Sequence, residues 1–345
     1  MNDPYYNHSN RGHRHRMTGL LSIIFILAVT SMLAACGNSS TGASHTNESN
    51  SSGTTASTAG THTDEQTHTI NYLGKTYTVP VTAKRIVITG SMEAMEDALS
   101  LDVHPVGAIT YRGKFPEKFA SITKDAQSIG EKTEPNFETI LSLKPDVILG
   151  TTKFDAAVVE QLNKIAPTIP VSHISDNWQD NLKLMGELSG KLEQANTAIS
   201  TYERDVAKAK EQLGARAQTD TVLAVRIRQG AVCVYPSNVF VNAALYEDLG
   251  LKVPDMIQQT KAQQEISIEQ LAQLNPDHLF IQFAEDENAD TPEALTALQN
   301  NPILNKTKAF QNQHVYVNVI DPLSEGGPAW SRDQFLQAAV KELTK

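Results

Sequence analysis

The sequence predicts an α/β protein of two lobes, each a mostly parallel sheet flanked by helices, joined by one long α-helix. Three observations lead to this prediction. Strand-like and helix-like segments alternate before residue 178 and again after residue 214, as in parallel sheets covered by helices. A long amphipathic segment separates the two blocks, and one short motif occurs once in each block.

Residues 1–35 have the features of a lipoprotein signal peptide. Three arginines precede an uncharged run, residues 19–35, which is short for a membrane span. The run ends in Leu-Ala-Ala before Cys36, which resembles a bacterial lipobox. We therefore expect cleavage before Cys36 and a lipid such as palmitate on its sulfur. This would anchor the protein on the outer face of the cell membrane, in the manner of Gram-positive bacteria. The alternative is an ordinary N-terminal anchor with a chance cysteine.

Residues 36–67 are rich in Ser, Thr, Asn and Gly, and we expect a flexible tether there. His45, His62 and His68 lie in or beside it, either as metal-trapping groups or as incidental residues. The other cysteine, Cys233, has no partner once Cys36 is acylated, so no disulfide is expected. We expect Cys233 to be a buried, inert thiol in a strand.

The first lobe is expected to cover residues 68–178. It begins with a predicted hairpin at residues 69–79, followed by alternating elements. The predicted strands are 85–89, 106–110, 147–150 and 170–174, and the predicted helices are 92–101, 137–143 and 156–165.

Residues 179–213 are predicted to form the connecting helix. Apolar residues recur every three or four positions from Leu182 to Leu213, which marks one face of a helix. The 22 residues from Leu192 to Leu213 contain no Pro or Gly and would span about 33 Å. Gly190 is expected to mark a kink or brief break. The segment is either a surface helix of one domain or a rigid connection between two lobes. A continuous helix bends little, so a connecting helix predicts that the lobes close only slightly when ligand binds.

The second lobe is expected to cover residues 214–345. Its predicted strands are 222–227, 231–235, 279–283 and 315–319, and its predicted helices are 239–249, 268–274, 292–299 and 330–343. Residues 267–279 repeat the pattern of residues 136–148, with Glu269 in the place of Glu138. In both copies a short helix stops before Pro and a buried strand follows, which favours one copy per lobe.

Basic residues follow several predicted strands. In open α/β sheets, ligands bind beyond the carboxyl ends of the strands. Cations at these ends would create a local positive field that suits an anionic ligand, although the net charge of the chain is −10. That net charge argues against nucleic-acid binding. The residues concerned are Lys153, Arg226 and Arg228 at strand ends, Lys132 in the turn at residues 130–135, and Lys261 and Gln263 in a loop before residue 269.

These features together resemble the substrate-binding lipoproteins of iron-siderophore ABC importers, and within that family the bacillibactin-binding type. The resemblance covers about residues 68–345. It rests on the lipobox, the two lobes, the long helix, the paired E-x-(I/L)-x-x-L-x-P-D motif and several further stretches. These stretches are GSMEAMEDAL (90–99), GEKTEPNFE (130–138), TTKF (151–154), VRIRQG (225–230), YPSNVFVN (235–242), KAQQEIS (261–267) and FAEDENA (283–289).

The resemblance implies a helical-backbone (class III) binding protein that captures a ferric siderophore between its lobes and delivers it to a membrane permease. The ligand would be a tris-catecholate such as ferric bacillibactin or enterobactin. Iron would be held through the siderophore, with no metal ligand from the protein and no cofactor, and we expect a monomer. The family implies a basic triad of Lys132, Lys153 and Arg228, with Arg226, Gln229, Lys261 and Gln263 nearby. It also implies that Glu138 and Glu269 dock onto arginines of the permease; favourable helix dipoles alone would also account for two glutamates at helix starts.

Three other functions would require different residues. Haem or another metal chelate is the main alternative, with Met92 and His173 as axial ligands. A free zinc or manganese ion needs several clustered His or carboxylate ligands, whereas His104, His173, His278 and His314 are scattered. An enzyme is not expected, because no nucleophile elbow, P-loop or dinucleotide fingerprint is present. The acidic residues 285–287 are best explained as a solvated loop.

Overall fold

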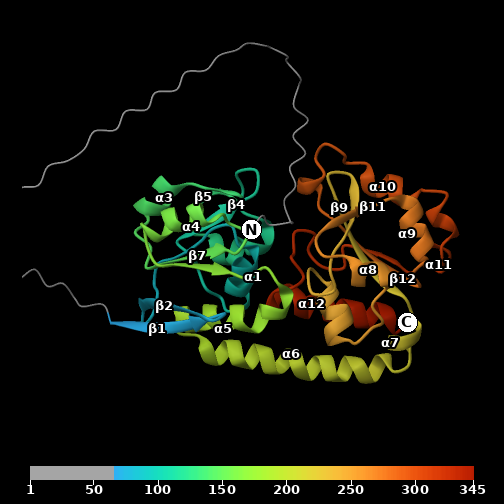
Figure 1. Ribbon diagram of the computed structural model, residues 1–345, viewed down its shortest axis with the longest axis horizontal. Coiled ribbons are helices and arrows are strands. Elements are labelled where there is room, and N and C mark those ends of the chain that lie inside the picture. Colours follow the sequence, from blue (N-terminus) through green and yellow to red (C-terminus); the bar gives the residue numbers. More distant parts are fainter. Residues whose placement is uncertain (1–65) are drawn as a thin grey trace, which may run out of the picture. The chain divides into compact units, whose positions relative to one another are not determined.

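The computed structural model describes residues 66–345, which form two α/β lobes joined by a long helix (Figure 1). The two lobes belong to one compact unit of the chain. Several predictions concern residues outside this range: the signal peptide, the lipidation site Cys36, His45, His62 and nearly all of the expected tether. The expected α/β architecture of two lobes and a long helix is confirmed.

The first lobe is built on a six-stranded sheet in the order β6-β5-β4-β3-β7-β8. The pairs β5–β4, β4–β3, β3–β7 and β7–β8 are parallel. The edge strand β6 pairs with β5 in the antiparallel direction. A separate antiparallel hairpin of β1 (Thr67–Tyr72) and β2 (Lys75–Pro80) precedes it. The strands are β3 (Ile86–Ile88), β4 (Gly107–Thr110), β5 (Gln127–Glu131), β6 (Glu134–Pro135), β7 (Val147–Thr151) and β8 (Thr168–Val171). The helices are α1 (Met92–Ser100), α2 (Ala120–Thr123), α3 (Phe137–Ser142), α4 (Ala156–Asn163) and α5 (Trp178–Ser189), with 3-10 turns η1 (Glu117–Phe119) and η2 (Ser175–Asn177).

The second lobe is built on a five-stranded mixed sheet in the order β11-β10-β9-β12-β13. Strands β9, β12 and β13 pair in parallel, whereas β10 is antiparallel to both of its neighbours. The strands are β9 (Val222–Arg228), β10 (Ala231–Val234), β11 (Gln264–Ile266), β12 (His278–Phe283) and β13 (Val315–Val317). The helices are α7 (Arg216–Thr219), α8 (Asp255–Gln259), α9 (Ile268–Leu274), α10 (Ala294–Gln299), α11 (Lys308–Gln311) and α12 (Ala329–Leu343), with 3-10 turns η4 (Glu285–Glu287) and η5 (Leu304–Lys306). The segment η3 (Ala243–Asp248) is a π-helix within the region where a longer α-helix was expected.

The segment predicted as one connecting helix, residues 179–213, is divided into α5 and α6 (Leu192–Leu213). Gly190 ends α5 in a left-handed conformation, with φ of 72°, which glycine adopts without the steric cost of a side chain. Helix α6 then turns back along α5. Gly186 lies so close to Ala195 and Leu192 that an added Cβ would come within 3.0 Å of both. The part that runs from one lobe to the other is therefore α6 alone (Figure 1).

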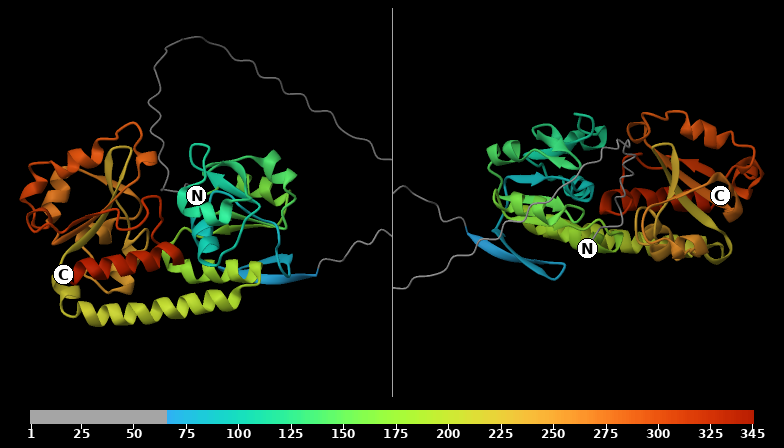
Figure 2. Two further views of the ribbon diagram at one scale, coloured as in Figure 1. Left: turned by 180° about the vertical axis from the view of Figure 1, so that it is seen from behind. Right: turned by 45° about the horizontal axis from the view of Figure 1, so that its top comes forward.

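Helix α12 of the second lobe also holds the lobes together, because it packs against α1, α5 and α6. Its Ser331 hydroxyl donates to the buried carboxylate of Glu96 on α1. Its Arg332 donates to the carbonyl of Ser175 at 3.1 Å and to Asp248 at 2.7 Å. Figure 2 shows α12 in red beside α6 in yellow-green. The connection between lobes is thus a packed interface as well as a single crossing of the chain.

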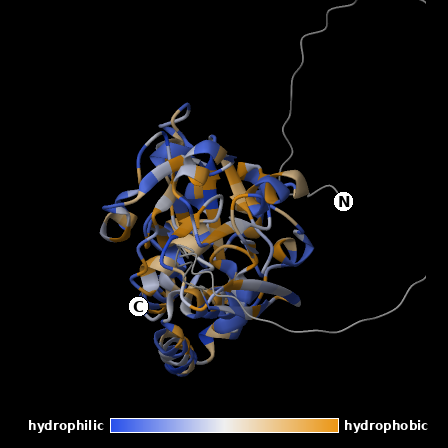
Figure 3. Cartoon of the chain, turned by 90° about the vertical axis from the view of Figure 1, so that its left-hand side faces the viewer, coloured by the Kyte–Doolittle hydropathy of each residue, from blue (hydrophilic) through white to orange (hydrophobic). Residues whose placement is uncertain are grey.

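The strands are buried and the outer elements are polar (Figure 3). Val87, Ile148, Val222 and Val225 have no exposed surface, as expected for sheets covered by helices. Cys233 is a buried free thiol in β10, as expected for its position in a strand, and burial raises its pKa to about 11. No helix within residues 66–345 is long and apolar enough to cross a bilayer.

Candidate functional site

The candidate site is formed by residues that follow the carboxyl ends of the parallel strands in both lobes. Lys132 follows β5, and Lys153 lies two residues after β7. Arg226 and Arg228 lie at the end of β9. Parallel strands end at the same edge of a sheet, so the topology of each lobe brings its own cations together.

The two lysines of the first lobe each meet a glutamate. Lys132 Nζ lies 2.7 Å from Oε1 of Glu325, which belongs to the loop after β13 in the second lobe. Lys153 Nζ lies 3.6 Å from Oε1 of Glu93 on α1, and the Ser91 hydroxyl donates to the other oxygen of Glu93 at 3.2 Å. Burial alone would lower the pKa of Lys132, but the nearby carboxylate of Glu325 raises it above its ordinary value. Lys132 therefore stays charged.

The two arginines of the second lobe share one glutamate, Glu287. Arg226 donates from Nε and Nη2 to the two carboxylate oxygens, at 2.8 and 2.9 Å, which is the strong bidentate arrangement. Arg228 Nη2 lies 3.3 Å from the same carboxylate. The Arg226 side chain is 6% exposed and that of Arg228 is 35% exposed. Arg228 is therefore the more accessible of the two cations to a ligand.

Asn288 fixes the loop that carries Glu287. Its side-chain amide donates to the carbonyls of Ile227 and Ala284 at 2.8 Å, and its oxygen accepts from the N–H of Gly230 at 3.0 Å. These bonds join the loop after β12 to the turn after β9. The pairing of Glu287 with both arginines is thus held by the backbone of two neighbouring strands.

The amide residues expected at the site lie around Arg228. Gln263 Oε1 accepts from Arg228 Nη1 at 2.8 Å and from the Tyr235 hydroxyl at 3.1 Å. Gln229 has an exposed side chain at the β9–β10 turn, and its N–H donates to the carbonyl of Glu287 at 3.1 Å. Lys261 is exposed two residues before Gln263 in the loop that leads to β11.

Three carboxylates at the site were missed from the sequence. The interpretation of residues 285–287 as a solvated loop is wrong for Glu287, whose side chain is only 12% exposed. Glu93, Glu287 and Glu325 follow strands β3, β12 and β13, so the strand-end rule that identified the cations also applied to them. The site contains four cations and three carboxylates and is less basic than the cations alone suggested.

Glu138 and Glu269 occupy equivalent exposed places near the starts of α3 and α9. Asn136 caps α3 by accepting from the N–H of Thr139 at 3.0 Å, and Ser267 and Gln270 form a capping box at α9. Hydrogen bonds from the peptide N–H and from Ser267 lower the pKa of Glu269. The cap bonds are made by Asn136, Ser267 and Gln270, so neither cap depends on the carboxylate of Glu138 or Glu269.

The geometry disfavours the alternative ligands. Met92 has no exposed surface, so its sulfur does not reach solvent as a haem ligand would. His173 Nδ1 lies 2.8 Å from the Thr152 hydroxyl. Within residues 66–345 no group of three or more His, Cys, Asp or Glu is placed to hold a metal ion.

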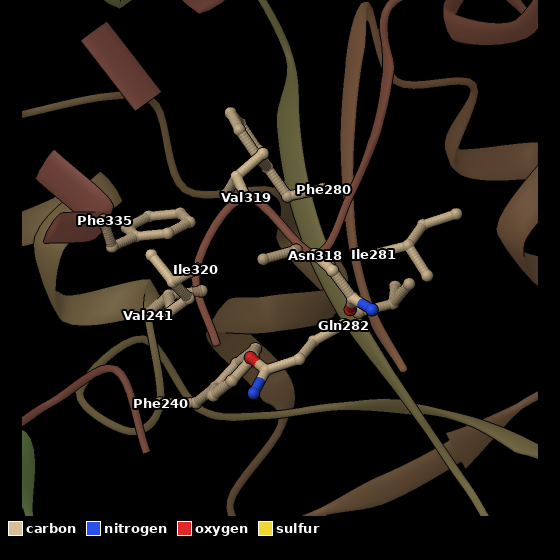
Figure 4. Close-up of a pocket in the computed structure, with 11 residues that line it drawn as sticks. Phe240, Val241, Phe280, Ile281, Gln282, Asn318, Val319, Ile320 and Phe335 are labelled. Atoms are coloured by element: carbon tan, nitrogen blue, oxygen red, sulfur yellow. The ribbon is translucent and has the colours of Figure 1, made fainter. Parts of the chain in front are cut away.

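An internal cavity of about 10 Å³ in the second lobe (Figure 4) is lined mainly by apolar residues such as Phe280, Ile320 and Phe335. A space of this size holds about one water molecule, so it does not accommodate a siderophore.

Comparisons with known proteins identify a family and several relatives of this chain. The family model described as periplasmic binding protein matches residues 87–318. The iron-uptake system-binding protein of Bacillus subtilis is 47% identical over 326 residues, which cover 94% of this chain and 98% of that protein. The Fe(3+)-citrate-binding protein YfmC of the same organism is 28% identical and covers 70% of this chain and 75% of its own.

A solved structure gives a similar result. The triscatecholate siderophore-binding protein FeuA from Bacillus subtilis, in complex with ferri-bacillibactin, superposes with a TM-score of 0.77 at 50% identity. The match covers 80% of this chain and 98% of that chain.

Proposed function

Because the chain belongs to the family of periplasmic binding proteins, we propose that it is the binding protein of an iron-uptake system and captures a ferric tris-catecholate siderophore. The observation that carries this proposal is the gathering of Lys132, Lys153, Arg226 and Arg228 at the strand ends of two lobes, in a protein of net charge −10. The similarity to a ferri-bacillibactin-binding protein supports the same ligand class.

The charge of the ligand fits this set of residues. A ferric tris-catecholate has a formal charge of about −3, and one ion pair at about 4 Å contributes about 4 kcal/mol at an effective dielectric near 20, before desolvation. Three such contacts are enough for a tight complex. We assign direct contacts with the ligand to Lys132, Lys153 and Arg228, and supporting roles to Arg226, Gln229, Lys261 and Gln263.

The proposal includes delivery to a membrane permease of the ABC type. Glu138 and Glu269 are exposed on equivalent helices of the two lobes, so one glutamate is available from each lobe. We assign to them contacts with basic residues of the permease. A lipid on Cys36 would keep the protein at the outer face of the membrane beside that permease.

The test is a titration of the protein with three ferric complexes, followed by quenching of the fluorescence of Trp178 and Trp330. Ferric bacillibactin is expected to bind more tightly than ferrioxamine or ferric citrate, because only the catecholate complex combines three bidentate rings with a charge of about −3. Equal or tighter binding of the hydroxamate or citrate complex would contradict the catecholate assignment. A Soret band on addition of haemin, without binding of ferric bacillibactin, would favour haem instead.

A further inference from the structure

Glu325 joins the two halves of the cation cluster. Its carboxylate comes from the second lobe and lies 2.7 Å from Lys132 Nζ in the first lobe. Burial alone would raise the pKa of Glu325, but the charges of Lys132, Lys153 and Arg226 outweigh this effect and hold the pKa well below its ordinary value. Glu325 is therefore ionised at neutral pH, and cations of both lobes stabilise its charge.

The backbone around Glu325 is fixed from both lobes. The N–H of Glu325 donates to the buried carboxylate of Glu96 in the first lobe at 2.9 Å. In the second lobe, Gln282 donates to the carbonyls of Pro322 and Ser324 at 2.7 and 2.8 Å. Figure 4 shows the Gln282 amide beside Phe240, and both residues line the small cavity of this lobe. The loop thus places the Glu325 side chain on Lys132, so the ion pair is a built feature and not an incidental surface contact.

A bound anion and the Glu325 carboxylate compete for the same positive charge. Lys132 is one of the residues assigned to the ligand, and its side chain is 24% exposed, compared with 18% for Glu325. A ligand oxygen next to Lys132 would lie close to the carboxylate, and like charges at such short range repel. The side chain of Glu325 can rotate away while its N–H remains bonded to Glu96.

We propose that Glu325 is a built-in competitor for the anionic oxygens of the ligand: it neutralises Lys132 in the ligand-free protein and leaves Lys132 when a ferric tris-catecholate binds. This inference rests on the proposed function and adds a residue that determines specificity. With Glu325 in place, the four cations exceed the three carboxylates by one charge. An anionic ligand must displace the carboxylate from Lys132 to bind, whereas a neutral chelate does not compete for that charge. Glu325 therefore lowers the affinity for anionic complexes and leaves the affinity for neutral chelates unchanged.

The test is the Glu325→Gln variant, titrated with ferric bacillibactin and with an electrically neutral ferric tris-hydroxamate. Glutamine keeps the shape of the side chain and an oxygen that accepts a hydrogen bond from Lys132, so the fold is expected to persist; circular dichroism and a melting curve check this. Ferric bacillibactin is expected to bind at least about tenfold more tightly than to the wild type. The affinity for the neutral complex is expected to stay within about twofold.

Two further variants serve as controls. Glu325→Asp keeps the charge and is expected to bind ferric bacillibactin within about threefold of the wild type. Glu285→Gln removes the same charge from an exposed position of the same lobe and is expected to change the affinity by less than about twofold.

The outcomes separate the inference from the proposed function. If the wild type binds no ferric tris-catecholate, the proposed function and the inference both fall. If the wild type binds it and Glu325→Gln binds it equally or more weakly, only the inference is overturned, and Glu325 then supports Lys132 in the complex. An equal gain for the neutral complex would show a steric effect and would also overturn it.

Discussion

Glu287 illustrates how single residues set the charge of the site. It accepts two hydrogen bonds from Arg226 and lies 3.3 Å from Arg228. Burial alone would lower the pKa of both arginines, but the carboxylate raises it. Removing Glu287 would leave two neighbouring guanidinium groups without compensation, and breaking a buried pair in this way destabilises a protein strongly. The carboxylate of Glu287 thus compensates the charges of two neighbouring arginines on β9.

A second residue pair predicts a pH dependence of stability. Glu247 of η3 makes a hydrogen bond with Asp176 of η2, and the two groups come from different lobes. Burial, followed by the bond to Asp176, raises the pKa of Glu247 to about 7. The positive charge of Arg332 lowers this pKa, and the negative charge of Asp248 raises it.

The folded protein therefore holds a proton on Glu247 that the unfolded chain releases near pH 4.3. The stability from this proton is complete below that pH and is lost as the pH rises to about 7. Glu247→Gln keeps the hydrogen-bond donor at every pH and is expected to melt about 1–3 °C above the wild type at pH 8, since solvent screens a half-exposed group. At pH 4.5 the two proteins should melt together.

Calorimetry at the two pH values measures this difference. The matched control is Glu160→Gln, which changes an exposed carboxylate paired only with Lys164. If the wild type and Glu247→Gln differ in melting temperature by the same amount at both pH values, Glu247 does not hold a proton in its hydrogen bond with Asp176.

Site residues could be predicted from the sequence where they lie at the carboxyl ends of predicted strands, because ligands of α/β sheets bind there. The rule located Lys153, Arg226 and Arg228 because each lies at or just after the end of a strand with a clear apolar pattern. Lys132 was assigned to the turn at residues 130–135, and β5, which it follows, was not predicted. The rule was not applied to carboxylates, so Glu325 was missed. Its ion pair also depends on a loop from the other lobe, and no local pattern in the sequence reports a contact between residues 193 positions apart.

At the scale of elements, the duplicated motif is the most informative feature. Helices α3 and α9 have the predicted positions, and each is followed by a buried strand of its sheet, β7 or β12. Their N-caps satisfy the first N–H groups of each helix. Glu138 and Glu269 are thus available for contacts with another protein.

We expect Glu138→Ala combined with Glu269→Ala to abolish uptake of siderophore-bound iron while ferric bacillibactin binding stays within about twofold of the wild type. Uptake of labelled iron by cells and a binding titration of the purified variant measure the two properties. Leu141→Ala, which truncates another exposed side chain of α3, is the control and should not reduce uptake. If the double variant loses binding to the same degree as uptake, the docking role is refuted.

Other elements could not be predicted from local patterns. Strand β11 has three residues, of which only Ile266 is buried, and it is defined by its pairing with β10. The reversal at Gly190 depends on the close approach of α5 and α6 at Gly186. The apolar repeat continues through this turn because both helices bury one face, so the sequence alone suggested a single rod.

At the scale of the whole molecule, two features hold the lobes. Helix α6 carries the chain from one lobe to the other, and α12 contacts α1 through the buried Glu96–Ser331 hydrogen bond. Lys118, whose side chain is 3% exposed, adds an ion pair to Glu96 at 2.9 Å. Buried charges that lose a partner are costly, so these contacts support the expectation of a small closure on ligand binding.

The central claim is that cations from both lobes bind one ferric tris-catecholate, and a calorimetric titration of ferric bacillibactin tests it most directly. The variants are Lys132→Ala from the first lobe and Arg228→Ala from the second, with Lys164→Ala, an exposed lysine of the first lobe, as the control. Each site variant is expected to lose about 10- to 150-fold in affinity, or about 1.5–3 kcal/mol, the range for hydrogen bonds to charged groups. The control should match the wild type. An affinity that is unchanged in both site variants would show that the siderophore binds elsewhere.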